Sequence, residues 1–451
     1  MDAYPAFRAV DVSLRDGSTV RIRPVRPDDG PAVLDLFDRL SPDALRMRFH
    51  GLHRLTAEEV QRFTSVDYDR TFGLVAETAA GRSGVIALAN YVAVSDRHAE
   101  IGIAVDDEHA GRGIGSIMIE HLGEAADAAG ISVFEAEVLT SNAAMLEVLR
   151  QMRLPVEQSV ASGVVHFEFP TSPTPEAVEA FELREGIAAA AAVARFFTPR
   201  SVAVLGASRR RGTIGGELFH NILEMGFEGP VYPINPSADV VQSVAAYRTL
   251  DDIPGPVDLA VIVVPAVHVL EAARACGAKG VGALLIISSG FSEIGAEGRE
   301  LQRELLSIAR GHGMRIVGPN CMGLINADPT VSLNATFSPI YPDSGRLAFS
   351  SQSGALGIAV IDRARQLGLG MSTFVSVGNK ADISGNDLLQ YWEQDDGTDV
   401  ILLYLESFGN PRKFARIARR VSKNKPIVAV KSGRSTAGAR AAASHTGSFA
   451  A

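Results

Sequence analysis

The sequence contains few cysteines and no long apolar run, and each shortage excludes a class of protein. Cys276 and Cys321 are its two cysteines, so a disulfide framework is not expected and a reducing compartment is. The longest apolar stretches, at 187–193 and 259–267, are much shorter than the roughly 20 residues of a membrane-spanning helix. No secretory start is recognisable. The sequence therefore predicts a cytoplasmic protein without a membrane span.

Lysine is absent from residues 1–170, where 26 acidic residues face 16 arginines. This segment has a net charge of −10, against −9 for the whole chain. Such an acidic surface disfavours binding to nucleic acid and modestly favours the approach of a basic protein. An ordinary solvated surface accounts for the same charge, and codon usage accounts for the preference for arginine.

The length of 451 residues and the 46% hydrophobic content allow about three domains, each with a full core. Residues 12–170 mix short strands with helices. The proline-rich stretch 170–175 and an alanine-rich helix from about 176 to 197 then separate this segment from the rest. We therefore expect an α+β domain over 12–170 and a linker with a helix over 171–196.

Short buried-strand runs separated by helical stretches follow, which is the pattern of parallel α/β sheets. We expect a Rossmann-like domain over 197–330 and a flavodoxin-like domain over 340–451, so the fold class is α/β. The predicted strands, beginning with those of the first domain, lie at 19–24, 85–94, 201–206, 257–264, 283–288, 315–317, 346–350, 371–377, 400–405 and 427–431.

The most informative stretch is 99–116, in which a strand breaks into a turn rich in glycine before an amphipathic helix over 114–129. Closely spaced glycines let consecutive backbone N–H groups approach a pyrophosphate, and the positive end of the helix dipole stabilises its charge. The turn alone is a weak signal, because such turns are often purely structural and a nucleotide would fit as well as CoA.

This stretch resembles motif A of the GCN5-related N-acetyltransferases (GNAT), in which the strand, the turn and the helix hold the pyrophosphate of CoA. Residues 14–24, 40–42, 48–49 and 66–70 are similar to the bacterial protein lysine acetyltransferases that are fused to acyl-CoA synthetase domains. The resemblance implies a GNAT fold and acetyl-CoA as the donor. The CoA contacts that it implies are Val105, Gly111, Arg112, Gly113, Ile114, Gly115 and Ser116.

Ala110 departs from the GNAT pattern, which usually has Gln or Arg at this position. A side-chain contact is lost there, whereas a backbone cradle from Gly111 to Ser116 is retained. Ser141 and Asn142, at the start of the next helix, resemble the second CoA-contacting turn of the family. Asn142 is equally suited to be a simple helix cap.

Acetyl transfer to an amine requires the amine to be neutral, so a general base must accept its proton directly or through water. Glu100 lies on the strand that leads into the turn. It matches the acidic residue that serves as the base in the similar protein acetyltransferases, and the resemblance implies the same role here. Without that match, a polar residue on a half-exposed strand would be the simpler interpretation.

Residues 202–208 and 212–216 form a strand, a glycine turn and a helix start, as in Rossmann-like domains that bind phosphates. They lack the spacing Gly-x-Gly-x-x-Gly of dinucleotide-binding domains. Ser208 and the arginines at 209–211 would suit the extra phosphate of CoA. The alternative is that residues 209–211 form a merely solvated loop. With loops at further strand ends, the strand, the turn and the helix start resemble the CoA-binding domain of the succinyl-CoA synthetase α subunit and of ADP-forming acetyl-CoA synthetases. The implied CoA contacts are Gly206, Ala207, Ser208, Pro236, Val264, Pro265 and Asn320.

The segment 350–355 opens a helix whose free N–H groups could bind a phosphate. Through Ser351, Ser353 and Gly354 it resembles the phosphate-holding helix of the same ligases. Glu406 and His445 fall where those enzymes place a carboxylate and the phosphorylated histidine that it orients. The chain ends six residues after His445, so we expect this domain to be incomplete. Ligase activity would need an ATP-grasp subunit on another chain.

These patterns lead to three hypotheses. The leading one is an acetyl-CoA-dependent N-acetyltransferase that modifies a lysine on proteins such as acyl-CoA synthetases, with a ligase-like module that binds acyl-CoA and regulates it. The alternative is the α component of an ADP-forming acyl-CoA synthetase that works through a phosphohistidine. The third is a non-catalytic CoA sensor. A small-amine acceptor stays open, and no metal, nucleic acid or membrane partner is expected.

Overall fold

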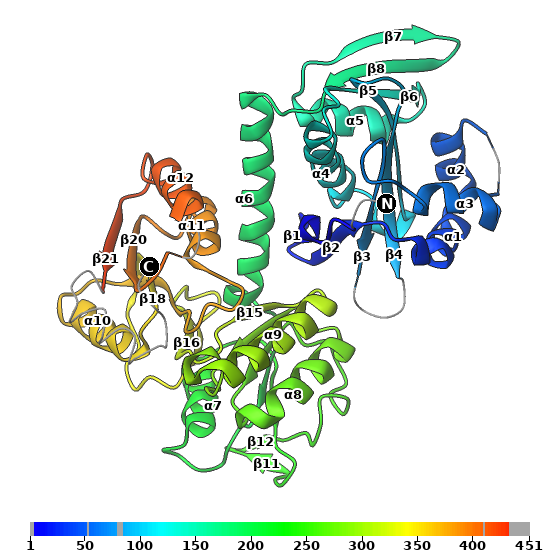
Figure 1. Ribbon diagram of the computed structural model, residues 1–451. Helices are drawn as coiled ribbons and strands as arrows, with labels where there is room; N and C mark the ends of the chain where they lie inside the picture. The colour runs from blue at the N-terminus through cyan, green and yellow to red at the C-terminus, as the bar shows by residue number, and fades with distance from the viewer. Residues whose placement is uncertain (1–3, 52–53, 79–83, 409–410, 433–451) are drawn as a thin grey trace. The chain divides into compact units, whose positions relative to one another are not determined.

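Two compact units make up the chain, Met1–Glu185 and Gly186–Ala451. The computed structural model describes residues 4–51, 54–78, 84–408 and 411–432 (Figure 1). Within these ranges, no helix is both long enough and apolar enough to cross a bilayer. Helix α6 (Pro175–Phe197) begins in the first unit and ends in the second.

The first unit is built on one eight-stranded sheet with the order β1-β2-β3-β4-β5-β6-β8-β7. Its neighbouring strands are antiparallel except β5 and β6, which run parallel. The strands are β1 (Val10–Ser13), β2 (Thr19–Pro24), β3 (Thr71–Glu77), β4 (Val85–Ala93), β5 (His98–Val105), β6 (Val133–Leu139), β7 (Glu157–Ala161) and β8 (Val164–Pro170).

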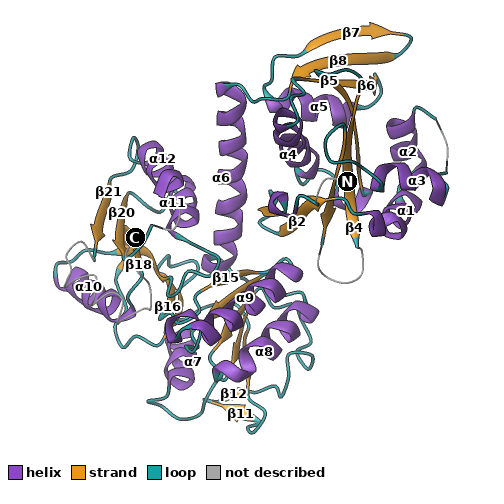
Figure 2. Ribbon diagram, in the orientation of Figure 1, coloured by secondary structure: helices purple, strands orange, loops and turns teal. Residues whose placement is uncertain are grey.

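Helices cover both faces of this sheet (Figure 2). Leu88 and Ala104 point to the face that packs on α1, α2 and α3. Ala87 and Ile101 point to the opposite face, which packs on α4 and α5. The alternation of side chains along a strand thus buries both faces in the middle of the sheet. The bounds are α1 (Gly30–Arg39), α2 (Pro42–Phe49), α3 (Ala57–Thr64), α4 (Ile114–Ala128) and α5 (Ala143–Met152).

The second unit starts with a sheet of five parallel strands in the order β10-β9-β13-β14-β15. The strand order reverses between β9 and β13, as in doubly wound folds. A short hairpin, β11 (Val240–Val241) and β12 (Val244–Ala245), follows β10. The other elements are β9 (Val202–Leu205), α7 (Ile214–Glu224), β10 (Val231–Ile234), β13 (Leu259–Ile262), α8 (Ala266–Lys279), β14 (Ala283–Ile286), α9 (Ala296–Gly311) and β15 (Arg315–Val317).

The second sheet of this unit has the order β17-β16-β19-β18-β20-β21. Strands β19, β18, β20 and β21 are parallel, whereas β16 runs antiparallel to both of its neighbours. The sequence patterns miss β16 and β17, because Asn326 and Asn334 interrupt two short apolar runs. The elements are β16 (Gly323–Asn326), β17 (Leu333–Thr336), β18 (Ser344–Ser351), α10 (Gly354–Gln366), β19 (Met371–Ser376), α11 (Gly385–Gln394), β20 (Val400–Leu405), α12 (Pro411–Val421) and β21 (Ile427–Lys431).

One hydrophobic core spans both sheets of the second unit, and it includes Phe219 from α7 and Val375 from β19. The two sheets are also joined by a buried ion pair, in which Arg315 Nε donates to Asp382 Oδ2 at 2.7 Å. Trp392, the one tryptophan of the chain, is fully buried in this core. Its Nε1 donates to a threonine hydroxyl of β19 at 2.8 Å. The two sheets therefore form one packed body.

Candidate functional site

Strands β5 and β6 pair at three positions, from His98 opposite Val133 to Glu100 opposite Glu135. Beyond Glu100, β5 stays paired with β4 up to Val105, and β6 stays paired with β8 up to Leu139. The two strands therefore part after Glu100. Alternate backbone N–H and C=O groups of β5 point into the gap, where an extended ligand could pair with them.

The glycine turn lies at the end of β5, where Gly111 (φ +75°) and Gly113 (φ +92°) both adopt the left-handed conformation. Helix α4 starts at Ile114, and the N–H of Ile117 is the one that bonds back to Gly113 O, at 3.2 Å. The N–H groups of the preceding three residues belong to the first turn, which has no intrahelical acceptors. Such N–H groups, together with the helix dipole, are suited to bind an anion.

Carboxylates in the segment between β5 and the turn tie it to the helices on the α1–α3 face. Arg39 Nε donates to Asp106 Oδ2 at 2.9 Å. The backbone N–H of Ser41 donates to Asp107 Oδ2 at 2.7 Å, and the Ser41 hydroxyl also caps α2 through the N–H of Ala44. The position of the glycine turn is thus fixed from outside the turn itself.

The side chain of Arg112 is engaged by residues of the loop before β2. Its Nε donates to Asp16 Oδ2 at 2.9 Å, and its Nη2 donates to the hydroxyl of Ser18. Arg112 therefore holds the turn against residues 14–18. Arg15 is a further cation beside the turn, and its Nε would lie 3.5 Å from a Cβ at Gly113. The sequence patterns assign no role to Arg15, although it belongs to the stretch 14–24 that carries the family resemblance.

The remaining predicted contacts of this site would act through their backbone. Ile114 and Ser116 are buried, and Gly115 packs on side chains of β5 and α5. Val105 ends β5 and is half-buried. Asn142 is the N-cap of α5, where its Oδ1 accepts the N–H of Met145 at 3.0 Å. In the structure, Asn142 therefore acts as a helix cap.

Glu100 is exposed on β5 and heads a row of carboxylates across four strands. Its register partner on β6 is Glu135. Glu135 is opposite Glu168 on β8, and Glu168 is opposite Glu157 on β7. His98 Nδ1 lies 2.7 Å from Glu135 Oε1, so the row has a histidine partner that can be protonated. A surface of this kind attracts cationic groups.

Arg48 is the second cation that the sequence patterns leave without a role. It reaches from α2 onto the sheet face that carries Glu100, where its Nη2 donates to Asn90 Oδ1 at 3.1 Å. Burial lowers the pKa of Arg48 to about 10, and the carboxylate of Glu100 acts in the opposite direction. The guanidinium is therefore still charged at neutral pH.

The second candidate site lies at the carboxyl edge of the five-stranded sheet. Every strand-end residue predicted to contact CoA in this unit lies at this edge. The topological switch between β9 and β13 is at the same edge, which is where doubly wound folds bind ligands. Gly206, Ala207 and Ser208 follow β9, Pro236 follows β10, Val264 and Pro265 follow β13, and Asn320 follows β15.

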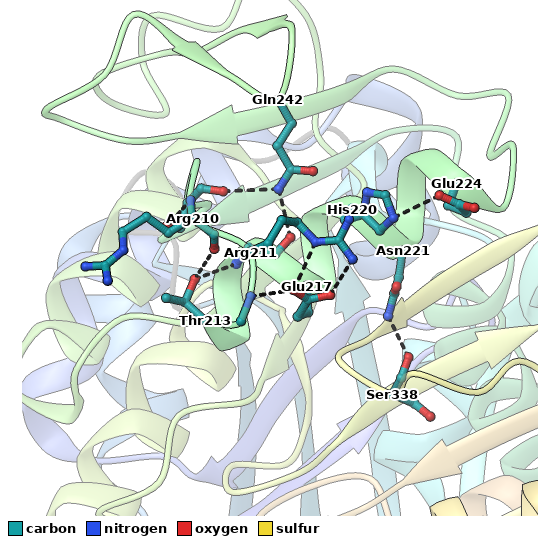
Figure 3. A network of polar contacts seen from close by, with 12 residues as sticks. Arg210, Arg211, Thr213, Glu217, His220, Asn221, Glu224, Gln242 and Ser338 are labelled. Atoms are coloured by element: carbon teal, nitrogen blue, oxygen red, sulfur yellow. Dashed lines mark hydrogen bonds and ion pairs between the residues drawn. The ribbon is translucent and has the colours of Figure 1, made fainter.

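The turn between β9 and α7 is closed by side chains (Figure 3). Arg211 pairs with Glu217 at 2.8 Å, and the N–H of Gly212 donates to Glu217 Oε1 at 2.5 Å. Hydrogen bonds from Arg211 and from Gly212 hold the pKa of Glu217 at about 2. Of the three arginines expected to suit a phosphate, Arg211 is thus engaged within the turn, whereas Arg210 extends away from Glu217 (Figure 3).

Two amides that the sequence patterns did not single out lock the same turn. Asn235 Nδ2 donates to Ala207 O at 2.8 Å. Gln242 Nε2 donates to Ser208 O at 3.1 Å and to Gly216 O at 2.8 Å (Figure 3). These contacts fix the backbone at positions 207 and 208, where CoA binding is predicted.

The third predicted site lies at the carboxyl ends of β18 and β20. Ser353 caps α10, Gly354 starts that helix, and the Ser351 hydroxyl donates to Ser353 O at 2.6 Å. Glu406 is buried, and Gln352 Oε1 accepts the N–H groups of Glu406 and of the following residue. The structure thus brings four predicted positions to one edge. His445 lies outside the described residues.

Lys380 is a further cation at this edge, and its role is not evident from the sequence. Its Nζ donates to the carbonyl and the hydroxyl of Ser407, at 2.8 and 2.6 Å. Burial lowers the pKa of Lys380 to about 8, against an opposing effect of Glu406. In the described part of the chain, no cluster of His, Cys, Asp or Glu is placed to hold a metal ion.

Three family descriptions match the chain in succession. Residues 19–154 match an acetyltransferase (GNAT) domain. Residues 200–327 match a CoA binding domain, and residues 344–451 match a succinyl-CoA ligase like flavodoxin domain.

Similar proteins fall into two groups. The chain is 32% identical over 146 residues to acetyltransferase Pat of Mycolicibacterium smegmatis, covering 32% of this chain and 43% of that protein. It is 47% identical over 258 residues to subunit alpha of ADP-forming acetate–CoA ligase I of Pyrococcus furiosus, covering 56% of this chain and 55% of that subunit.

A solved structure supports the second group. The dinucleotide-forming acetyl-coenzyme A synthetase 1 of Ca. Korarchaeum cryptofilum, in complex with phosphate and ADP, is 47% identical with a TM-score of 0.55. The match covers 57% of this chain and 55% of that one. The chain spans about half the length, or less, of the curated relatives it matches.

Proposed function

We propose that this chain, which matches a GNAT acetyltransferase domain, a CoA binding domain and a succinyl-CoA ligase like domain in succession, is an acetyl-CoA-dependent N-acetyltransferase. The observation that carries the proposal is the parting of β5 and β6 beside the glycine turn. The donor's pyrophosphate would bind the first N–H groups of α4. Its extended arm would pair with the open edge of β5.

In the proposed reaction, acetyl-CoA supplies the activated acetyl group, and the chain supplies a base and hydrogen-bond donors. Glu100 accepts a proton from the acceptor amine, so that the neutral nitrogen attacks the thioester carbonyl carbon. The C–N bond forms, the C–S bond breaks, and the sulfur leaves as the CoA thiol after taking up a proton. Backbone N–H groups on the open edge of β5 stabilise the oxyanion.

The acceptor in this proposal is a lysine on a protein such as an acyl-CoA synthetase, in the cytoplasm. The carboxylate row that starts at Glu100 supports a cationic acceptor, because four glutamates on adjacent strands attract an ammonium group and its basic neighbours. A small amine acceptor would need only Glu100, and not the other three glutamates of the row.

The test is Glu100→Gln, measured at saturating acetyl-CoA. Loss of a general base lowers kcat by about 100-fold or more, while the affinity for acetyl-CoA stays unchanged because the glutamine is isosteric. Mass spectrometry of lysine acetylation on candidate acceptor proteins identifies the substrate in the same experiment. An unchanged kcat would show that Glu100 is not the base.

For the ligase-like unit we propose binding of acyl-CoA and regulation of the transferase. The locked turn after β9 and the strand-end residues at the same edge support a CoA site. Calorimetry on the full chain should then detect two CoA sites. Substitutions in the turn after β9 should remove one of them.

A second candidate function is that of the α component of an ADP-forming synthetase with a separate ATP-grasp chain. The 47% identity to such a subunit and the convergence of Ser351, Ser353 and Glu406 favour it. Incubation with an ATP-grasp subunit and labelled ATP should then label His445. A chain that stays unlabelled at this histidine would rule out this function.

A further inference from the structure

Arg48 lies across a pair of opposed residues on β4 and β5. Its Nη2 donates to Asn90 Oδ1 at 3.1 Å. A Cβ at Gly102 would overlap the guanidinium, so the group lies directly against the backbone of Gly102. Asn90 and Gly102 are register partners. The guanidinium thus takes the space that a side chain at position 102 would fill.

Glu100 is the next residue of β5 on the same face. Side chains alternate between the faces of a strand, so residues 100, 102 and 104 share one face. Ala104 lies in the core beneath α1–α3, which identifies that face. The Cα atoms of Glu100 and Gly102 are about 7 Å apart in a strand. A guanidinium over Gly102 is therefore within reach of the Glu100 carboxylate, whose charge opposes the lowering of the Arg48 pKa by burial.

Arg48 is held in place by groups other than Glu100. Its guanidinium carbon lies 5.1 Å from the ring centre of Phe49 and 5.9 Å from that of Phe63, distances at which cation–π attraction acts. The N-terminus of α2 is anchored to Asp107 through Ser41. The cation therefore has a fixed position to which the exposed carboxylate of Glu100 can be drawn.

We propose that Arg48 is a positioning residue that draws the carboxylate of Glu100 along β5 toward Gly102, where β5 is no longer paired with β6. Position 102 is then a glycine because the guanidinium needs its space. The inference rests on the proposed role of Glu100 as the base. It gives a function to the Arg48–Phe49 pair, which otherwise contributes only to the family resemblance.

A double-mutant cycle on the full chain tests this proposal. The acceptor probe is a short peptide with one lysine between arginines, and the release of CoA thiol is measured. Arg48→Met is expected to lower kcat roughly 10- to 100-fold, the range expected for a displaced catalytic group, with little change in the KM for acetyl-CoA. Arg48→Lys should restore part of the lost kcat, because lysine has the positive charge but lacks the planar guanidinium with its paired N–H donors.

The decisive comparison is with Glu100→Gln. If Arg48 acts through Glu100, Arg48→Met should hardly lower kcat any further once Glu100 is already glutamine. The effects of two groups that act as a unit on kcat are not additive. If Arg48→Met lowered kcat by the same factor in the wild type and in Glu100→Gln, the positioning role would be overturned, while Glu100 would remain the base. An unaltered rate in Glu100→Gln alone would instead overturn the proposed base and with it this inference.

Two further measurements separate positioning from a general loss of structure. Arg46→Met is the matched control, because Arg46 lies on the same helix and pairs with Asp43 near the surface, at 3.6 Å. It should leave kcat unchanged. A crystal structure of the acetyl-CoA complex is expected to show the Glu100 carboxylate within hydrogen-bonding distance of Arg48. A carboxylate turned away from Arg48 would overturn the proposal even if the peptide were a poor acceptor.

Discussion

The carbonyl oxygen of Gly206 occupies the space where the side chain of residue 215 would begin. Gly206 begins the turn after β9 and is in the left-handed conformation, at φ +94°. Gly215 lies in the first turn of α7. The strand end and the helix start can approach this closely because neither has a Cβ in the way. The close approach fixes the backbone at which CoA is expected to bind in the second unit.

Gly215→Ala should therefore weaken CoA binding by the second unit, by about 10-fold or more, because the helix start must move away from the turn. Calorimetric titration of the full chain with CoA measures this as the loss of one of two sites. Gly385→Ala is the control, since a Cβ at this other helix start would meet Leu405 at an ordinary 4.0 Å. Retention of both sites by Gly215→Ala would contradict the expected role of the turn.

Glu217 should make the second unit sensitive to acid. Its pKa is about 2 in the folded chain, below the ordinary 4.5, because Arg211 and the N–H of Gly212 bind the carboxylate. A depressed folded pKa gives stability that is present above about pH 4.5 and lost as the pH falls toward 2. The Tm difference between the wild type and Glu217→Gln should thus be largest near neutral pH and shrink below pH 4.5.

The control for this titration is Glu224→Gln, on the same helix. Glu224 is exposed and pairs with His220 at 2.8 Å, and exposed pairs contribute little. Its Tm should stay close to that of the wild type. A Tm difference for Glu217→Gln that does not change between pH 7 and pH 3 would show that Arg211 and Gly212 do not stabilise the ionised form.

The carboxylate row should act on the acceptor and not on the donor. Glu168→Gln removes one charge two strands away from Glu100. For a basic peptide acceptor at low salt, we expect its KM to rise about two- to fivefold, an effect that added salt abolishes. The KM for acetyl-CoA should stay the same. Glu147→Gln, on helix α5 and away from this row, should change neither constant. A rise in the KM for acetyl-CoA would contradict the assignment.

The placement of lysines gives a fourth prediction. All six lysines lie at or after position 279, so the acetyltransferase domain has none. A lysine-directed acetylating reagent should leave acetyl transfer at saturating donor almost unchanged. Arg15→Lys should make the enzyme sensitive, because residue 15 lies beside the glycine turn. Rapid inactivation of the wild type by the reagent would show that transfer depends on the second unit.

The same reagent should distinguish between the lysines of the second unit. Lys279, Lys425 and Lys431 donate to backbone carbonyls at 2.6 to 2.8 Å. An ammonium group bound in this way is protected from acylation. Lys423 is exposed and should be modified first, which peptide mapping can establish.

In the first unit, local patterns gave the bounds of two strands, 19–24 and 85–94, and indicated the strand before the glycine turn, whereas in the second unit they gave the bounds of eight. Strands at 19–24, 315–317, 400–405 and 427–431 have the bounds expected from the sequence. Helix α4 starts at Ile114 as expected. These elements are set by apolar alternation, by continuous buried runs and by glycine, all of which are visible along the chain. Strands β16 and β17 were missed because their apolar runs are short and polar residues interrupt them.

The sequence predicted the backbone of the candidate sites and not the contacts of their side chains. Glycine spacing identified the turns at 111–115 and 206–216. No local pattern indicates that Arg112 turns toward Asp16, or that Arg48 crosses from α2 to Gly102. Such contacts join residues that are far apart along the chain and depend on tertiary packing. A glycine inside a strand can indicate that another group packs against the backbone, and Gly102 was the feature of the sequence that could have predicted the contact with Arg48.

The burial of Trp392 makes the intrinsic fluorescence of this protein a reporter of one half of the chain. Emission excited through tryptophan arises from the second unit alone, because the indole is packed in the core shared by its two sheets. If the two halves melt independently, unfolding of the acetyltransferase domain leaves that signal unperturbed. A denaturation curve followed by tryptophan emission and one followed by far-UV circular dichroism would thus resolve whether the two halves melt independently.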